Sequence, residues 1–389
     1  MLGVLLLSAA MIVPVAVATD AHVDYREWRG AAEFAQGEAE GVTASTSGDG
    51  LVIGSPVGSE GGYEFARWTS PRHAAEFGAT QVVASWNALT PAGTWLQVDL
   101  RGPDTGWYAM GRWASGDTDI RRTSVPDQSD EHGRVDVDTF QAAEGHALRE
   151  VQLRVTLYRA QGTTATPTLL MAGAMASALP DAFTVPASEP GPARGVELPV
   201  PRYSQNVHEG GESLCSPTST EMVVEYWGRG PTPDDLAGID PTHPDRSVEY
   251  AAGHTHDLDY DGDGNWPFNT AYAATFGLRG HITRLRSLTE LETYVARGVP
   301  VITSQSFRED ELDGAGYGTA GHIMVVVGFT EDGDVIANDP ASPSNEAVRH
   351  VYRRAQFETI WLRTKRHEAD GSVSDGPGGI VYVIEPATG

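Results

Sequence analysis

The chain has 389 residues, more than one hydrophobic core usually organises, so its length predicts two domains. A content of 40% hydrophobic and 21% charged residues is typical of a globular protein and excludes a disordered or fibrous one. The formal net charge of -26 repels phosphate backbones and anionic lipids, which argues against nucleic-acid binding and favours an acidic, soluble surface.

Residues 1–18 form an apolar segment that ends in Ala16-Val17-Ala18. Small residues at this spacing are typical of a signal-peptidase site, and the segment is short for a membrane span. We therefore expect a signal peptide, a secreted, extracellular protein and no membrane span after cleavage. An uncleaved N-terminal anchor is the alternative.

Residues 25–180 have the pattern of an all-β domain. Short runs with alternating apolar and polar residues, such as 93–102 and 147–160, are separated by turn sequences rich in Gly, Asp and Pro. This pattern predicts an antiparallel β-sandwich or jelly roll. Five tryptophans of the region either form its core, which we favour, or a stacking platform for a cell-wall or surface glycan: Trp68, Trp86, Trp95, Trp107 and Trp113.

Residues 181–195 are rich in Pro, Ala and Gly, which is typical of a semi-rigid linker. Residues 196–389 then have an α+β pattern. We expect a helix over 217–228, a second helix with a capping box from Ser287 to Glu290, and apolar strands over 299–307 and 322–330. A second strand of a hairpin over 335–340 and a terminal strand over 379–386 follow.

Cys215 is the only cysteine of the chain and lies next to the start of the first predicted helix. One cysteine in an exported protein forms no internal disulfide, so the thiol is inert, joined to another chain, or reactive. Backbone N–H groups at a helix N-terminus stabilise a thiolate, and the flanking glycines and serines are not typical core residues. The local sequence therefore favours a reactive thiol over a buried inert one.

A catalytic thiolate needs a base and a group that orients the base. His322 begins an apolar strand, where a polar ring needs a hydrogen-bond partner. A hairpin loop of two or four residues brings Asp339 to the face of His322, whereas a loop of three brings Asn338, and we prefer Asp339. Gln205, ten positions before Cys215, is the candidate oxyanion donor together with the Cys215 N–H. A core histidine satisfied by backbone and a plain surface glutamine are the alternatives for His322 and Gln205.

Together, YSQ (203–205), LCSPTSTEMVVEYWG (214–228), GHIMVVVGF (321–329) and VIANDPAS (335–342) make residues 196–385 resemble papain-like cysteine peptidases. The resemblance is closer to the bacterial family related to the bacteriocin-leader-processing, or double-glycine, peptidases. It implies a papain-like fold and thiol-dependent amide hydrolysis without a cofactor. At the matching positions it implies a Cys215 nucleophile, a His322 base, an Asp339 orienting group and a Gln205 oxyanion residue.

Two features depart from that family. The leader-processing enzymes are joined to membrane transporter domains, and no spanning segment follows residue 18 here, so their double-glycine specificity does not transfer. The spacing from Gln205 to Cys215 is also long, with HEGGE (208–212) inserted. The resemblance further implies that residues 254–269 lie near the catalytic cleft, with Trp266 and Phe268 as packing residues or as a substrate-binding wall.

Residues 257–268 begin like an EF-hand calcium loop, with acidic residues at Asp257, Asp259, Asp261 and Asp263, but the twelfth position is Phe268 instead of Glu. We therefore favour a turn rich in Asp and Asn over a calcium site. A zinc site built from three histidines, His243, His254 and His256, is the weaker alternative, because nothing fixes a ligand set. No metal is expected.

The sequence thus predicts a secreted α+β cysteine peptidase that hydrolyses a peptide or protein substrate through a thioester on Cys215. An acyltransferase or transamidase would use the same residues with an amine acceptor in place of water. A non-catalytic surface- or carbohydrate-binding protein, with an idle thiol, is the second alternative. The N-terminal domain is expected to position the substrate or to tether the enzyme to a surface.

Overall fold

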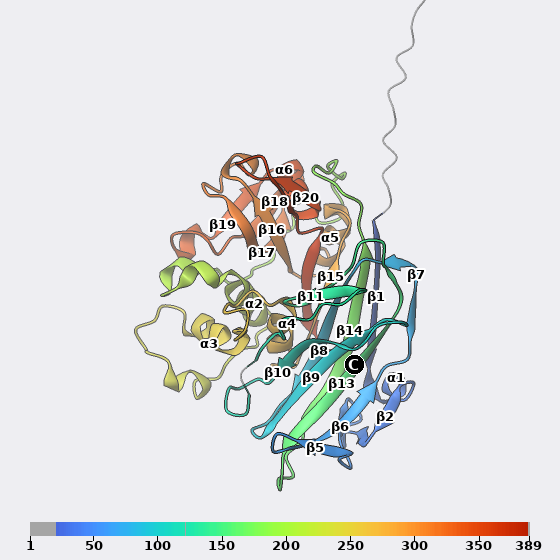
Figure 1. The fold of residues 1–389 in the computed structure, drawn as a ribbon. Helices are drawn as coiled ribbons and strands as arrows, with labels where there is room; N and C mark the ends of the chain where they lie inside the picture. The colour runs from blue at the N-terminus through green and yellow to red at the C-terminus, as the bar shows by residue number, and fades with distance from the viewer. Residues whose placement is uncertain (1–20, 121, 388–389) are drawn as a thin grey trace, which may run out of the picture.

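A computed structural model describes residues 21–120 and 122–387, which form a β-rich N-terminal part and a C-terminal part of mixed helices and strands (Figure 1). The predicted signal peptide, residues 1–18, lies outside the described residues. Among the helices that are described, none has both the length and the apolar character needed to cross a membrane.

The first sheet of the N-terminal domain is antiparallel, with the strand order β11-β12-β8-β14-β4-β3 and with β1 paired to β14. Its strands are β1 (His22–Arg29), β3 (Val42–Ala44), β4 (Leu51–Ile53), β8 (Gln81–Leu89), β11 (Gly133–Asp136), β12 (Thr139–Ala142) and β14 (Thr168–Ala178). A short helix, α1 (Gly30–Phe34), follows β1.

The second sheet is also antiparallel and has the order β10-β9-β13-β6-β2, with β5 on β6 and β7 on β13. Its strands are β2 (Glu38–Glu40), β5 (Gly58–Glu60), β6 (Tyr63–Thr69), β7 (His73–Ala79), β9 (Thr94–Arg101), β10 (Tyr108–Trp113) and β13 (Leu148–Ala160). The long strand β13 explains the extended alternating pattern of the sequence over 147–160.

One hydrophobic core lies between the two sheets, as the alternation of apolar residues requires. Trp28 and Trp86 come from the first sheet and Trp68 and Trp113 from the second, and all four are fully buried. The Trp28 and Trp68 rings meet edge to face at 5.9 Å between centroids. Trp68, Trp86 and Trp113 are therefore core residues, as we favoured, and they offer no stacking platform to a sugar. Trp95 is buried in a separate small cluster, whereas Trp107 is only partly buried and has the Arg101 and Arg154 guanidinium groups 4.4 Å from its ring centroid.

The C-terminal domain is built on a six-stranded antiparallel sheet of order β15-β22-β16-β17-β18-β19. Its strands are β15 (Leu278–Arg284), β16 (Val301–Phe307), β17 (Thr319–Phe329), β18 (Val335–Asn338), β19 (Arg349–Tyr352) and β22 (Ile380–Pro386). A separate two-stranded sheet pairs β20 (Lys365–His367) with β21 (Val373–Asp375).

Helices cover both faces of this sheet. Apolar residues of α2 (Cys215–Tyr226) and α4 (Trp266–Ala274) pack on one face, and those of α5 (Leu288–Val295) and α6 (Arg354–Leu362) pack on the other. The helix α3 (Arg246–Thr255) packs against α2. The 3₁₀ helices are η1 (Gln205–Val207), η2 (Gly211–Ser213), η3 (Asp235–Gly238), η4 (Glu309–Glu311) and η5 (Asn345–Ala347).

Two helix starts differ in detail from the sequence prediction. The first predicted helix begins at Cys215, two residues before the expected Pro217, because the turn of η2 leads directly into it. At α5 the Ser287 hydroxyl accepts from the Glu290 N–H as expected, whereas the Glu290 carboxylate accepts from the N–H of Arg286. The nucleophile candidate is thus the first residue of its helix.

The two domains contact each other through α4 and β15. Phe268 and Ala271 of α4 are part of the N-terminal core, so this helix lies between the two domains (Figure 1). Side chains of β8 also bond the backbone of β15: Asn87 Nδ2 donates to Gly280 O at 2.8 Å, and Ser85 Oγ accepts from Ile282 N at 2.9 Å. The N-terminal domain therefore fixes the position of the helix that follows the acidic loop 257–265.

The segment predicted as a linker, residues 181–195, has no helix or strand but is held in place. The N–H groups of Gly191 and Ala193 donate to the buried Glu292 carboxylate on α5, at 2.8 and 3.0 Å. Arg354 on α6 bonds the same carboxylate at 2.7 Å and Ser188 O at 2.7 Å. The segment is tied to both helices on one face of the C-terminal sheet.

Candidate active site

Cys215 is a free, partly buried thiol at the first position of α2. The N-cap residue, Leu214, makes no capping hydrogen bond through its side chain, so the first N–H groups of the helix and the positive end of its dipole stabilise negative charge on the sulfur. The next residue, Ser216, is fully buried and its Oγ lies 2.9 Å from the Tyr382 hydroxyl of β22. This contact holds the first turn of α2 against the sheet.

His322 and Asp339 form a buried pair. His322 Nε2 lies 2.8 Å from Asp339 Oδ1, and the two side chains are only 5% and 1% exposed. Asp339 directly follows β18, where Val326 pairs with Ala337, so position 339 falls opposite 324, on the face of His322. With Nε2 held by the carboxylate, Nδ1 is the ring nitrogen left for Cys215.

Three further donors fix the Asp339 carboxylate. The hydroxyls of Tyr317 and Tyr352 donate to Oδ2 at 2.8 and 2.7 Å, and Ala341 N donates to Oδ1 at 3.0 Å. The sequence did not predict either tyrosine at this site. Tyr352 comes close to Asp339 only because β19 pairs with β18, and Tyr317 lies in the segment just before β17. The alternative residue, Asn338, bonds elsewhere: its Nδ2 donates to Pro201 O at 3.0 Å. The structure therefore places Asp339, and not Asn338, against the imidazole.

The pair is charged over most of the pH range. Burial lowers the pKa of His322, but the Asp339 carboxylate and the neighbouring Cys215 side chain outweigh burial and raise it to about 10. Burial raises the pKa of Asp339, whereas His322 and the hydrogen bonds from Tyr352 and Tyr317 bring it down to about 2. An imidazolium–carboxylate pair is thus favoured at neutral pH, next to a thiol at a helix N-terminus.

Gln205 is buried and links the segments that carry the other candidates. Its Nε2 donates to Gly211 O at 2.7 Å, four residues before Cys215, and its backbone N donates to Pro340 O at 2.9 Å, directly after Asp339. A Cβ at Gly211 would lie 2.0 Å from Gln205 O, so only glycine fits there. The residues inserted between Gln205 and Cys215 form compact turns, which compensate for the long spacing in sequence.

Two family models match this chain. The peptidase C39 N-terminal domain matches residues 24–177, and the peptidase C39-like family matches residues 197–369, which include Gln205, Cys215, His322 and Asp339. The C-terminal part of the chain, residues 197–369, is therefore similar to the peptidase C39-like family. No curated protein matches the chain. These two matches support a cysteine-type peptidase whose N-terminal β domain has a family model of its own.

The side chain of Phe268 is not accessible to a substrate. Its side chain is fully buried in the N-terminal core and meets the Trp86 ring edge to face at 6.0 Å. The prediction of a substrate wall is therefore wrong for Phe268, because the apolar side chain fills the space between the domains. Trp266 is only partly buried and packs on the same hydrophobic cluster as Cys215, and its backbone N donates to Asp138 Oδ2 at 2.8 Å.

In the EF-hand-like segment, the first acidic residue, Asp257, is hydrogen-bonded by other groups of the protein. The buried Asp257 carboxylate accepts from Ser124 N at 2.8 Å and from Asn265 Nδ2 at 2.8 Å, and its backbone pairs with Gly262. A carboxylate with these partners is not arranged as a calcium ligand. The segment thus forms a turn rich in Asp and Asn, as we favoured from the sequence, and Ser124 of the N-terminal domain is one of its hydrogen-bond partners.

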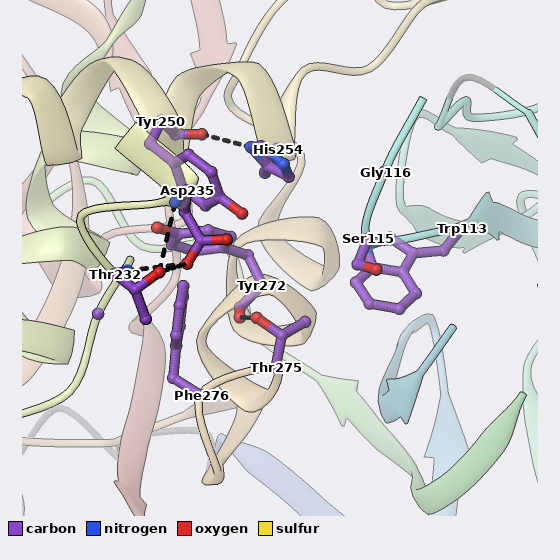
Figure 2. Close-up of a pocket in the computed structure, with 11 residues that line it drawn as sticks. Trp113, Ser115, Gly116, Thr232, Asp235, Tyr250, His254, Tyr272, Thr275 and Phe276 are labelled. Atoms are coloured by element: carbon purple, nitrogen blue, oxygen red, sulfur yellow. Dashed lines mark hydrogen bonds between the residues drawn. The ribbon is translucent and has the colours of Figure 1, made fainter. Parts of the chain in front are cut away.

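A pocket of about 410 Å³ lies between the two domains (Figure 2). Trp113 and Ser115 line one side, and Tyr250, His254 and Tyr272 are among the residues that line the other. His254 Nδ1 lies 2.7 Å from Tyr250 O, and burial lowers the pKa of His254. Because neither Cys215 nor His322 lines this pocket, it is separate from the candidate catalytic pair.

Proposed function

We propose that this protein is an exported, papain-like cysteine peptidase that hydrolyses peptide or amide bonds through a thioester on Cys215. The observation that carries the proposal is the buried His322–Asp339 pair next to the sole cysteine, which starts a helix. The match of this region to a peptidase family supports the same chemistry. Export rests on the signal-like pattern of residues 1–18.

In the proposed reaction the Cys215 thiolate attacks the carbonyl carbon of the scissile amide, and the carbonyl oxygen becomes an oxyanion. The Gln205 amide and the Cys215 N–H donate hydrogen bonds to this oxygen. His322 transfers its proton to the leaving amine as the C–N bond breaks, which leaves a thioester and a neutral imidazole. Asp339 keeps the ring oriented and stabilises its charged form.

Water then completes the turnover. The neutral His322 removes a proton from a water molecule, whose oxygen attacks the thioester carbon. Collapse of the second tetrahedral intermediate releases the carboxylic acid and restores the thiolate and the imidazolium. The charged resting state of His322 supports this cycle, because its proton is needed in the first half-reaction.

A papain-like fold for residues 196–389 and a β-sandwich for residues 25–180 are part of the proposal. The helix that begins with the nucleophile packs on a sheet whose strand carries the base, and this arrangement supports the first assignment. Two antiparallel sheets around one core support the second. The N-terminal domain would position the peptide or protein substrate by holding α4 and the acidic loop beside the site.

The test is cleavage of a defined peptide mixture by the full chain in ¹⁸O-labelled water, with products identified by mass spectrometry. The proposal expects new carboxyl termini that carry the label, and no product from the Cys215→Ser variant. The control is Ser213→Ala, which changes an exposed hydroxyl two residues away and leaves cleavage intact. Products joined to an added amine without label would establish a transamidase instead, and an inert wild type with every peptide would refute the peptidase.

A further inference from the structure

Three potential metal ligands from distant parts of the sequence meet beside α3. His208 follows η1, His243 precedes α3 and Glu249 lies in the first turn of α3, and their ligand atoms all lie within 4.8 Å of one another. Glu249 Oε1 lies 2.7 Å from His208 Nδ1 and 3.2 Å from His243 Nδ1. Only one of these three residues, His243, belongs to the histidine set that the sequence suggested for zinc.

We propose that His208, His243 and Glu249 bind a Zn²⁺ ion. Two imidazoles and one carboxylate are ligands that zinc prefers, and they leave a fourth, tetrahedral position for water. Zinc bonds of about 2.0–2.1 Å separate neighbouring ligand atoms in a tetrahedral site by about 3.3 Å. The 3.2 Å separation at His243 matches this value, and the 2.7 Å separation at His208 needs an adjustment of well under 1 Å.

The surroundings of His208 supply an independent argument for a metal. Its side chain has no solvent exposure, and its Nε2 has no hydrogen-bond partner within the described part of the chain. If Nδ1 instead donated a proton to Glu249, a neutral ring would leave Nε2 as a buried, unpaired acceptor, which is costly.

A metal at Nδ1 removes this cost, because the ring proton then sits on Nε2. This nitrogen lies 3.9 Å from Asp245 Oδ2. A small movement of the two side chains toward each other would form a hydrogen bond between them, and zinc-bound histidines usually donate such a bond to a carboxylate. Asp245 is itself oriented, since its Oδ2 accepts from Asn345 Nδ2 at 2.9 Å. The chain thus provides three ligands and the outer partner of the most buried one.

Zinc at this position would fasten the turn that precedes the nucleophile to α3. His208 N donates to Gln205 O at 3.2 Å, and Gly211 N donates to His208 O at 3.2 Å, so His208 forms the middle of the turn between these residues. The ion would therefore order the residues around Gln205. An effect of zinc on catalysis rests on the proposed function, whereas the binding site itself does not.

The experiment is a calorimetric titration of zinc chloride into the full chain after removal of bound metal with a chelator. All proteins carry Cys215→Ser, because a thiol next to an imidazole is itself a zinc ligand. The test variants are His243→Ala and Glu249→Gln, both at partly exposed positions. His367→Ala, at an exposed histidine of the C-terminal domain, is the matched control.

We expect one equivalent of zinc to bind the Cys215→Ser protein and the His367→Ala control, with at least tenfold weaker binding in both test variants. Saturating zinc should also raise the unfolding midpoint of the first two proteins by roughly 2–4 °C, with little change in the test variants. Calcium should produce neither effect, because it prefers all-oxygen sites. Absence of zinc binding, or equal binding in the test variants, would overturn the zinc site and leave the peptidase proposal standing.

Discussion

Replacing Asp339 with Asn removes the negative charge next to His322 while keeping the shape of the side chain. An oxygen remains to accept from His322 Nε2, but the charge that outweighs burial is lost. An opposite charge this close shifts a pKa by roughly 1–3 units. We therefore expect the pKa of His322 to fall from about 10 to roughly 7–9, which costs the imidazolium about 1.4–4 kcal/mol.

The sign of the effect follows from the direction of the shift. A raised histidine pKa means that the proton is held, and the ion pair persists, until the pH rises through that pKa. Loss of the Asp339 charge should therefore move the alkaline limit of peptide hydrolysis to lower pH by roughly 1–3 units, with a smaller change in the acid limit.

The assay is the initial rate of hydrolysis of one cleaved peptide, followed from about pH 5 to about pH 10.5. Asp332→Asn is the matched control, because Asp332 is an exposed carboxylate in the loop between β17 and β18. The reasoning fails if the alkaline limit of Asp339→Asn equals that of the wild type, or if Asp332→Asn moves it by the same amount.

Three further substitutions test other contacts. Gln205→Ala should lower kcat by about 10²–10³ with little change in KM, because it removes an oxyanion donor; a change confined to KM would contradict that role. Tyr352→Phe removes a hydrogen bond that helps to lower the pKa of Asp339 to about 2. The Asp339 carboxylate stabilises the folded state at pH values above its pKa in the unfolded chain, and in the variant this stabilisation should be lost at a higher pH as the solution is acidified. An acid-unfolding curve, followed by circular dichroism, that is the same as that of the wild type would refute this. Phe268→Ala should lower the free energy of unfolding, measured with urea, by about 3–5 kcal/mol. A decrease below about 1 kcal/mol together with a raised KM would instead support contact of Phe268 with the substrate.

The sequence pattern could narrow the partner of His322 to Asp339 or Asn338, but the pattern alone could not decide between them. The sequence located both residues at the end of the right strand, but the face depends on register, and both strands are apolar on both faces. The loop of residues 330–334 has five residues, and an irregularity between Val326 and Gly328 shifts the pairing by one more position. A sequence contains no clear signal for such a shift, so only the structure could assign the partner of His322.

The burial of Phe268 could not be predicted for a similar reason, because it also depends on contacts between distant parts of the chain. The sequence indicated an acidic turn before Phe268, but it predicted neither the helix α4 that contains this residue nor its position against the N-terminal domain. Contacts between domains depend on surfaces that are separated by more than 150 residues in sequence, such as Trp86 and Phe268. Glu249 and His208 also meet without a local motif that connects them, although both lie in the C-terminal domain. Gln205, Cys215 and Asp339 were easier to find, because each lies at or next to the end of an element. His322 was found from the apolar run around it, although β17 begins at Thr319 and not at His322 as the sequence predicted.

The most direct test of the account is the alkylation of Cys215 by iodoacetamide at about pH 6, well below the free-thiol pKa of about 8.5. The Cys215–His322 pair predicts rapid modification of the wild type, and a rate at least tenfold lower in His322→Ala, with a matched control at His367→Ala that reacts like the wild type. Intact-mass spectrometry gives an unambiguous readout, because the chain has a single cysteine. A thiol that reacts slowly at this pH, or equally fast without His322, would contradict a catalytic pair at this site.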